Sequence, residues 1–250
     1  MTAAAIDARG LGRDFGAIRA LDALDLEVRE AEFFGLLGPN GAGKTTTVHL
    51  LATLLRPTRG TARVAGYDVV REDLETRRRI GLVFQETTLD RDLTVEQNLR
   101  FAARLWNLPG RIAGPRIDHL LGQFGLRERR RDVVRTLSGG MRRALDIARG
   151  LLHEPRVLFL DEPTAGLDPR ARRALWELIQ RLRAASGLTV FLTTHYVEEA
   201  EPCDRVAVLD RGALAALGTP AELKRATGVS SLEAVFLART GHPLAEPSAA

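Results

Sequence analysis

The chain has 250 residues, of which 45% are apolar and 27% charged, so it can bury a core as one large domain or two small ones. The single cysteine, Cys203, excludes an internal disulfide and a cysteine zinc cluster, and with a net charge of only +4 the arginine excess is a weak indication of nucleic acid or a membrane surface. No apolar run approaches the roughly 18 residues of a membrane helix and the first residues lack a signal-peptide pattern, so we expect a soluble, cytoplasmic chain that reaches a membrane only through a partner.

The amino-terminal part predicts β-structure followed by a strand and a helix. Residues 6–28 alternate loosely, contain β-type residues and are punctuated by glycines, which predicts two antiparallel strands. The short apolar run 33–37 predicts a buried strand, and residues 44–55 place apolar side chains at helical spacing. The loop that joins this strand to this helix is therefore a candidate binding loop.

That loop fits the phosphate-binding pattern G-x-x-x-x-G-K-[ST] at every fixed position. Its residues are Gly38, Pro39, Asn40, Gly41, Ala42, Gly43, Lys44 and Thr45. Glycines allow turns that a Cβ would block, so that main-chain N–H groups and the helix N-terminus can face a phosphate. Lys44, one of only two lysines, would reach the outer phosphates, and Thr45 would offer a hydroxyl to magnesium. A chance glycine-rich turn is the alternative, and the matching strand and helix argue against it.

The middle of the chain changes to purely helical patterning. Before the change we expect a turn at 56–60, a strand at 61–65, a short helix at 73–79 and a strand at 80–84 that ends at Gln85. After it we expect helices at 94–106, with Thr94 as N-cap, and at 112–124, followed by a basic run at 126–135 that we interpret as a solvated face. These segments predict an all-α insertion, about residues 86–150, in an α/β frame.

The last part of the chain returns to alternating strands and helices. The expected helices are 139–153, 170–186, 220–226 and 230–237, and the expected strands are 156–160, 188–193 and 204–209. Such alternation predicts an α/β fold with a mostly parallel core sheet. We expect one domain over residues 1–240 and a flexible tail at 241–250.

Two carboxylates follow the apolar run 157–160. In nucleotide hydrolases an acid at the end of such a strand holds magnesium, usually through water, which is the role that Asp161 fits. Glu162 beside it could polarise the attacking water as general base. An acidic pair at a loop start can also be a helix cap, and the phosphate loop elsewhere in the chain favours the catalytic interpretation.

A second glycine-containing helix start follows Leu137. Ser138, Gly139 and Gly140 open a predicted helix, whose N-terminus would attract phosphate. One chain cannot easily bring both helix starts to one triphosphate if the helical insertion carries the second away, whereas a second copy, placed head to tail, could. The alternative is an ordinary serine N-cap, and the position just ahead of the acidic strand argues against it.

Five sequence features follow one another in the order of the ATP-binding cassette (ABC) ATPases, and the chain resembles that family from residue 6 to about 240. They are the phosphate loop, Gln85, Leu-Ser-Gly-Gly-Met at 137–141, Leu-Asp-Glu-Pro at 160–163, and His195. The segments 92–95 and 231–237 resemble the daunorubicin-resistance type, which powers drug export. The resemblance implies a P-loop NTPase domain of the ABC type, in which an antiparallel β subdomain and an all-α helical subdomain flank the core sheet.

The resemblance also implies a role for each matching residue. Phe15 would stack on adenine, and the loop from Gly38 to Thr46 would hold phosphates and magnesium. Gln85 would contact magnesium and the attacking water, and His195 would contact the γ-phosphate. Ser138, Gly139 and Gly140 would close on the nucleotide of the other subunit, and Asp168 would cross the dimer interface.

By the same resemblance, the chain is expected to be an ATPase subunit that uses ATP and Mg²⁺. It would form a homodimer around two nucleotides and drive a separate membrane permease, exporting a drug-like or lipophilic substrate, from the inner face of the cell membrane. The alternative is a soluble ABC ATPase acting on nucleic acid or ribosomes. Such chains usually carry coiled-coil insertions, zinc cysteines or two cassettes, so no nucleic-acid partner is expected. A small-molecule kinase would leave Leu-Ser-Gly-Gly without a role.

Overall fold

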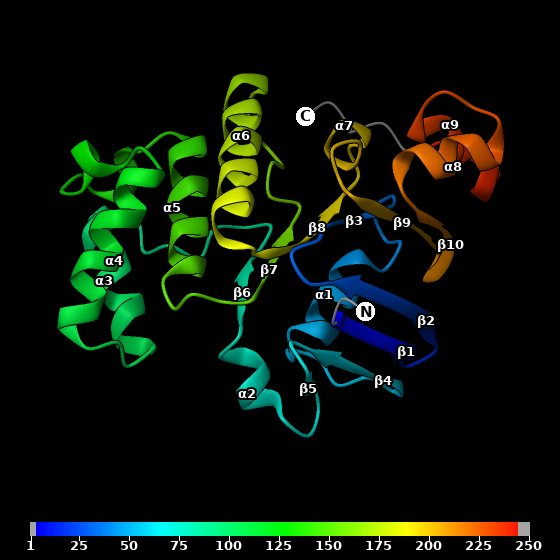
Figure 1. Cartoon of the computed structure of the whole chain (residues 1–250), viewed down its shortest axis with the longest axis horizontal. Helices are drawn as coiled ribbons and strands as arrows, with labels where there is room; N and C mark the ends of the chain where they lie inside the picture. The colour runs from blue at the N-terminus through cyan, green and yellow to red at the C-terminus, as the bar shows by residue number, and fades with distance from the viewer. Residues whose placement is uncertain (1–3, 245–250) are drawn as a thin grey trace.

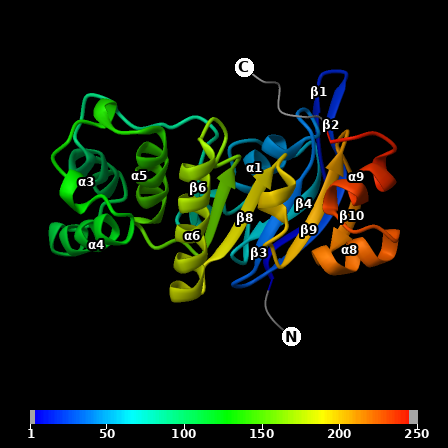
Figure 2. The same cartoon turned by 90° about the horizontal axis from the view of Figure 1, so that it is seen from above.

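A six-stranded sheet crosses the middle of the molecule in the strand order β10-β9-β3-β8-β7-β6 (Figures 1 and 2). Its strands are β3 (Phe33–Leu37), β6 (Ile80–Val83), β7 (Val157–Asp161), β8 (Thr189–Thr194), β9 (Arg205–Asp210) and β10 (Ala213–Gly218). Every neighbouring pair is parallel except β9 and β10. The expected, mostly parallel core sheet is therefore confirmed. This computed structural model describes residues 4–244, without the side chains of residues 184–186, so most of the predicted tail lies outside the described residues.

Parallel pairing brings the carboxyl ends of the central strands to one edge of the sheet. In the register of the strands, Leu37 pairs with Thr194 and Asp161 pairs with Thr193. The phosphate loop, Glu162 and His195 each follow one of these strands directly. Ligands of open parallel sheets bind at this edge, so the fold itself brings these segments together.

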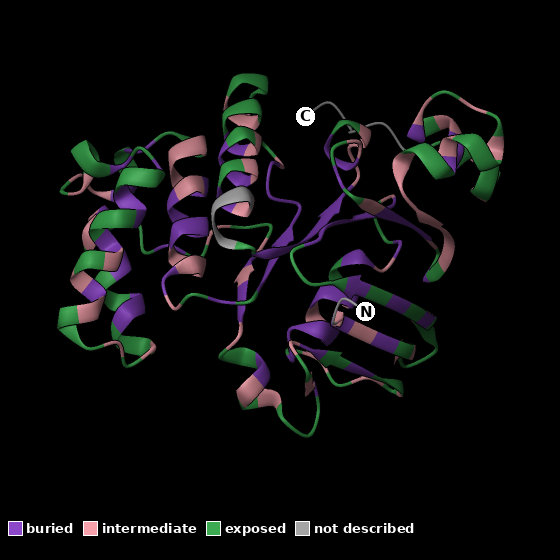
Figure 3. Cartoon of the chain, in the orientation of Figure 1, coloured by how far each residue is buried: buried purple, intermediate pink, exposed green. Residues whose placement is uncertain are grey.

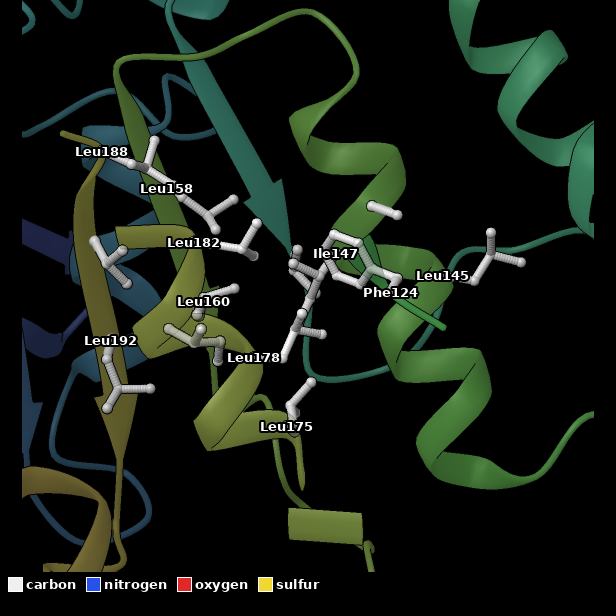
Figure 4. Close-up of a cluster of buried hydrophobic side chains, with 14 of the residues drawn as sticks. Phe124, Leu145, Ile147, Leu158, Leu160, Leu175, Leu178, Leu182, Leu188 and Leu192 are labelled. Atoms are coloured by element: carbon white, nitrogen blue, oxygen red, sulfur yellow. The ribbon is translucent and has the colours of Figure 1, made fainter. Parts of the chain in front are cut away.

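Apolar layers cover both faces of the sheet, and alternate residues of each strand supply them. The helices involved are α1 (Lys44–Leu51), α5 (Gly139–Leu151) and α6 (Pro169–Ser186). Phe34 belongs to the layer that contains α1, whereas its neighbour Phe33 belongs to the layer that contains α5 and α6. In that second layer Leu178 of α6 packs towards Leu160 of β7 (Figure 4). The central strands are buried on both sides (Figure 3), as is usual for parallel sheets.

A second, antiparallel sheet packs against the other side of α1, with the strand order β2-β1-β4-β5 (Figure 1). Its strands are β1 (Ala4–Phe15), β2 (Ile18–Arg29), β4 (Arg59–Val64) and β5 (Tyr67–Asp68). β1 and β2 form the antiparallel pair that the sequence predicts for residues 6–28. The β subdomain of the expected fold class is thus present.

A group of helices lies at the other end of the molecule, beyond β6 (Figure 1). It contains α3 (Val95–Leu105), α4 (Gly110–Gln123), the short 3₁₀ helices η1 (Arg127–Arg129) and η2 (Val134–Thr136), and α5. Thr94 begins α3 as expected, because its hydroxyl accepts the Gln97 N–H while the Gln97 side chain accepts the Thr94 N–H. α4 begins two residues earlier than predicted, directly after Pro109.

The remaining helices are short. They are α2 (Asp73–Arg77), α7 (Val197–Ala200), α8 (Pro220–Thr227) and α9 (Leu232–Thr240). Neither β10 nor α7 was predicted from the sequence. β10 is a half-buried edge strand of mostly small residues, which gives no clear alternation, and α7 has four residues. Within residues 4–244, no helix combines the length and apolar character that crossing a bilayer requires.

Candidate nucleotide site

The phosphate loop curves tightly between β3 and the start of α1. Gly43, at the N-cap of α1, has φ 103°, and a Cβ at Gly38 would come within 2.3 Å of the Leu209 carbonyl oxygen. Only glycine accommodates these two constraints. No side chain of the described residues caps α1, so its first N–H groups remain available to an anion.

Lys44 is buried beneath this loop. Its Nζ donates to the carbonyl oxygens of Gly38 and Pro39, at 2.9 and 3.0 Å, and forms an ion pair with Glu162 Oε1 at 3.0 Å. The loop's carbonyls therefore fix the ammonium group between the loop and the end of β7. A single positive charge in this place can serve either Glu162 or a phosphate group.

Glu162 lies at the centre of the charged groups. Its Oε2 is 3.1 Å from His195 Nδ1, and its backbone has φ 45°, a left-handed conformation that is uncommon outside glycine. Burial would raise the pKa of Glu162, but the hydrogen bond with His195 and the charge of Lys44 outweigh it and hold the pKa at about 2. The carboxylate is therefore ionised, with its two oxygens directed to different cationic or donor groups.

Thr193 joins the two acidic residues and was not predicted from the sequence as a site residue. Its hydroxyl donates to Asp161 Oδ1 at 2.5 Å and accepts the Glu162 N–H at 3.1 Å. This threonine is fully buried in β8, directly across from Asp161. A pair of polar residues at the end of an apolar strand, Thr193 and Thr194 just before His195, was the available signal.

Lys44 and Glu162 line a cavity of about 350 Å³ at the edge of the sheet. Its lining residues are Ala20, Asn40, Gly41, Gly43, Lys44, Thr45, Thr46, Gln85 and Glu162. The cavity thus brings together the phosphate loop, Gln85 and Glu162 from three separate parts of the chain. Ala20, which comes from β2, is a lining residue that no sequence motif indicated.

Three oxygen-bearing side chains near this cavity fit a magnesium ion. Thr45 offers a hydroxyl, Gln85 an amide oxygen and Asp161 a buried carboxylate, and Mg²⁺ prefers such hard oxygen ligands. The described residues contain no cluster of three or more His, Cys, Asp or Glu that could hold a metal on its own.

The second helix start lies in a different place. Ser138 and Gly140 line another cavity, of about 500 Å³, together with Asp168 and residues of α5 and α6. There Ser138 Oγ accepts the Met141 N–H at 3.2 Å, and Asp168 Oδ1 accepts the N–H groups of Arg170 and Ala171. Within the single chain these side chains cap their own helices. The structure therefore does not bring them to the phosphate loop.

Phe15 also lies apart from the cavity lining. It ends β1 at the tip of the β1–β2 hairpin, is 43% exposed, and has the Arg13 guanidinium 4.7 Å from its ring centre. An exposed ring of this kind offers a free face for stacking. Adenine stacking by Phe15 stays a prediction.

The geometry can be compared with known proteins. The ABC transporter family model matches residues 21–165. The chain is 49% identical over 237 residues to the daunorubicin resistance ATP-binding protein DrrA3 of Streptomyces coeruleorubidus, covering 94% of this chain and 75% of that protein. It is 48% identical to the doxorubicin resistance ATP-binding protein DrrA of Mycobacterium tuberculosis, over 88% of this chain and 66% of the relative.

A solved ATP-binding subunit of an ABC transporter superposes with a TM-score of 0.83 at 31% identity, covering 94% of this chain and 99% of that one. The match extends over the core sheet, the antiparallel sheet and the helical region, so the expected fold class is confirmed as a whole. Together with the cavity that gathers the phosphate loop, Gln85 and Glu162, these similarities show that the chain belongs to the ABC transporter family as an ATP-binding subunit.

Proposed function

We propose that the chain hydrolyses ATP to ADP and phosphate, with Glu162 as the general base for the attacking water. One observation supports this proposal most: the Glu162 carboxylate is held between Lys44 Nζ and His195 Nδ1 in the cavity of the phosphate loop. A fixed, ionised carboxylate beside a phosphate site has the geometry of a proton acceptor.

Nucleotide binding would change the electrostatics of Glu162. When Lys44 directs its charge to the phosphates, less of that charge stabilises the carboxylate, so the pKa of Glu162 rises from about 2 towards its usual range. A carboxylate with a higher pKa accepts a proton more readily. The same lysine would thus bind the substrate and release the base for reaction.

Magnesium would be held by Thr45, Gln85 and Asp161. When bound, the ion supplies positive charge that neutralises the phosphate oxygens. His195 would contribute a hydrogen bond at the γ-phosphate side of the cavity, where it already contacts Glu162. Thr193 would keep the acidic residues in register by its bonds to both.

A second copy of the chain would complete the site. Ser138 and Gly140 line a separate cavity, so one chain alone does not present them to the nucleotide of its own loop. A head-to-tail dimer with two-fold symmetry would place the α5 start of each protomer over the phosphate loop of its partner. We infer that two ATP molecules are held in this way, with Asp168 near the shared interface.

The work of this ATPase would be transport through a separate membrane permease. The relatives named above are called daunorubicin or doxorubicin resistance ATP-binding proteins, which supports export of a drug-like or lipophilic substrate. The chain would then act at the inner face of the cell membrane. Co-purification with a membrane protein is the expected result, whereas co-purification with nucleic acid or ribosomes would contradict this assignment.

The test of the base is the variant Glu162→Gln. We expect it to bind ATP and to lose turnover by at least about 100-fold, because an amide accepts no proton. With ATP retained, the variant should elute as a dimer in size-exclusion chromatography with light scattering. The matched control is Glu128→Gln, a change of an exposed glutamate in η1. Wild-type turnover in Glu162→Gln would show that the base is another group.

A further inference from the structure

Helix α5 holds the segment that contains Gln85 through a buried arginine. Arg143 is only 3% exposed, and its two terminal nitrogens donate to the carbonyl oxygens of Phe84 and Gln85, each at 2.5 Å. The segment follows β6, which runs beside α5 (Figure 4). A guanidinium with two donors fixes two successive carbonyls at once and so sets the orientation of the peptide between them.

A second arginine holds the same segment three residues further along. Arg149 donates to the Thr88 carbonyl oxygen at 2.8 Å and to the Thr88 hydroxyl. Residues 84–93 join β6 to α3 without regular structure apart from bends, so their own backbone gives them little rigidity. The two arginines thus secure both ends of the stretch from Phe84 to Thr88 on one helix.

A buried carboxylate lies close to both arginines. Asp146 is 1% exposed, and its oxygens lie 2.7 Å from Arg149 and 3.9 Å from Arg143. Positions 143, 146 and 149 are spaced by three residues and share one face of the helix. Burial raises the pKa of Asp146, and the two guanidinium groups oppose that effect. We call Arg143, Asp146 and Arg149 the α5 clamp.

Burying the charged groups of the clamp costs desolvation free energy, and apolar side chains could pack in the same place. Replacing buried ion pairs by apolar residues is often neutral or stabilising, so a buried ionic cluster is weak evidence for a role in stability. These three residues instead fix the position of the main chain around Gln85 relative to α5. Ser138 begins the same helix, and Gln85 lines the nucleotide cavity.

We propose that the α5 clamp makes Arg143 and Arg149 positioning residues, which join Gln85 and Ser138 into one unit that moves together relative to the phosphate loop. Gln85 faces the nucleotide of its own chain, and Ser138 faces that of the partner. A movement of this unit would therefore change the protein contacts of both nucleotides in the dimer. This inference rests on the proposed function for its consequences in catalysis, and on the contacts of residues 84–88 for the mechanical link.

The first test measures the link directly, without catalysis. Spin labels at Glu86→Cys and Thr136→Cys report the distance between the Gln85 segment and the start of α5, since both sites are exposed and the native Cys203 is buried. By pulsed EPR we expect one narrow distance distribution with and without ATP. In Arg143→Gln the distribution should broaden. An unchanged distribution in that variant would overturn the proposal.

The second test measures the magnesium dependence of ATP hydrolysis. If the clamp orients Gln85, Arg143→Gln should raise the half-saturating Mg²⁺ concentration by about tenfold, the factor of one hydrogen bond to a charged group. ATP affinity measured without Mg²⁺ should stay unchanged, and Arg143→Lys should restore part of the loss. A purely structural role would lower the melting temperature and leave the Mg²⁺ dependence as in wild type, which contradicts the proposal.

Two further variants protect the test against misfolding and nonspecific effects. Thr88→Val removes the hydroxyl that accepts from Arg149 and leaves the buried charges in place, so it should fold and raise the Mg²⁺ requirement a few-fold. Arg100→Gln is the control, because Arg100 is an exposed arginine of α3 that pairs with Glu96. A wild-type protein without ATPase activity would refute the proposed function. The spin-label distances would still show whether the clamp links the Gln85 segment to α5.

Discussion

The two glycine-containing helix starts, of α1 and of α5, satisfy their N–H groups in different ways. At α1 the N-cap is Gly43, and no described side chain bonds to the first turn. At α5 the N-cap is Ser138, whose hydroxyl accepts the Met141 N–H. The first start leaves its donors free for a phosphate within the chain, and the second is closed on itself until another ligand competes.

The surroundings of the two helix starts differ in the same sense. α1 begins at the cavity of the phosphate loop, where Lys44 and Glu162 form a buried ion pair. α5 begins on the edge of a separate cavity, with an exposed serine. From this difference we propose that one chain can bind nucleotide at α1 by itself, whereas the α5 start acts only after a second surface approaches.

The largest expected effect comes from Lys44→Ala, which removes the charge beside α1. ATP affinity should fall by at least about 100-fold, because the positive charge proposed to bind the outer phosphates is lost. Isothermal titration calorimetry measures this change. Lys224→Ala is the matched control, since Lys224 is the only other lysine and pairs with Glu201 far from the cavity. Equal affinity in both variants would refute the phosphate role of the loop.

A somewhat smaller effect is expected from His195→Ala. The hydrogen bond of His195 helps to hold the pKa of Glu162 at about 2, so its loss raises that pKa. The base must be ionised to act, and the acid limb of the kcat–pH profile should therefore move to higher pH. The rate at neutral pH should fall by about 100-fold for a separate reason, because the γ-phosphate loses the hydrogen bond proposed for His195. An acid limb at its wild-type position would show that His195 does not act on Glu162.

Ser138→Ala tests the second helix start against a cap that has no proposed function. Loss of an N-cap costs about 1 kcal/mol, or about 3 °C in melting temperature for a chain of this size. Thr94→Ala in α3 should cost the same. Only Ser138→Ala should also lower turnover, while the ATP affinity of the single chain stays unchanged. If both variants retain full turnover, Ser138 serves as a structural cap alone.

The smallest effect concerns the stability of the helical region that carries α5. The hydrogen bond from Arg130, helped by Arg100 against the opposing effect of burial, holds the pKa of Glu96 at about 2, below the usual 4.5. A depressed pKa gives stability that is present above pH 4.5 and lost as the pH falls towards 2. Glu96→Gln should therefore flatten the decrease of melting temperature in this range. A slope equal to that of wild type would assign the acid sensitivity to other carboxylates.

The phosphate loop and the edge of the sheet were predictable because both follow from local pattern. A glycine loop that joins an apolar strand to a helix predicts a phosphate site directly. The run before Asp161 is continuously apolar and so predicts a buried strand. Parallel pairing then places Glu162 and His195 at the same edge of the sheet as the loop. Thr94 likewise begins its helix where the capping pattern places it.

Other features depend on tertiary structure that no local pattern contains. The left-handed backbone of Glu162 and its contact with Lys44 arise from the crossing of two segments more than a hundred residues apart. The bond from Thr193 to Asp161 depends on the register of β7 and β8. The clamp of Arg143 depends on where the irregular stretch after β6 passes α5. Each of these is a pairing between elements, which sequence spacing does not specify.

The central claim, one nucleotide held between α1 of one protomer and α5 of its partner, can be tested by mixing two inactive variants. Lys44→Ala keeps a working α5 start, and Ser138→Arg keeps a working phosphate loop. Each alone should be inactive, whereas their equal mixture should recover about a quarter of the wild-type rate, since half the dimers carry one intact site of two. A mixture as inactive as its components would contradict the shared site and show that each chain forms its site alone.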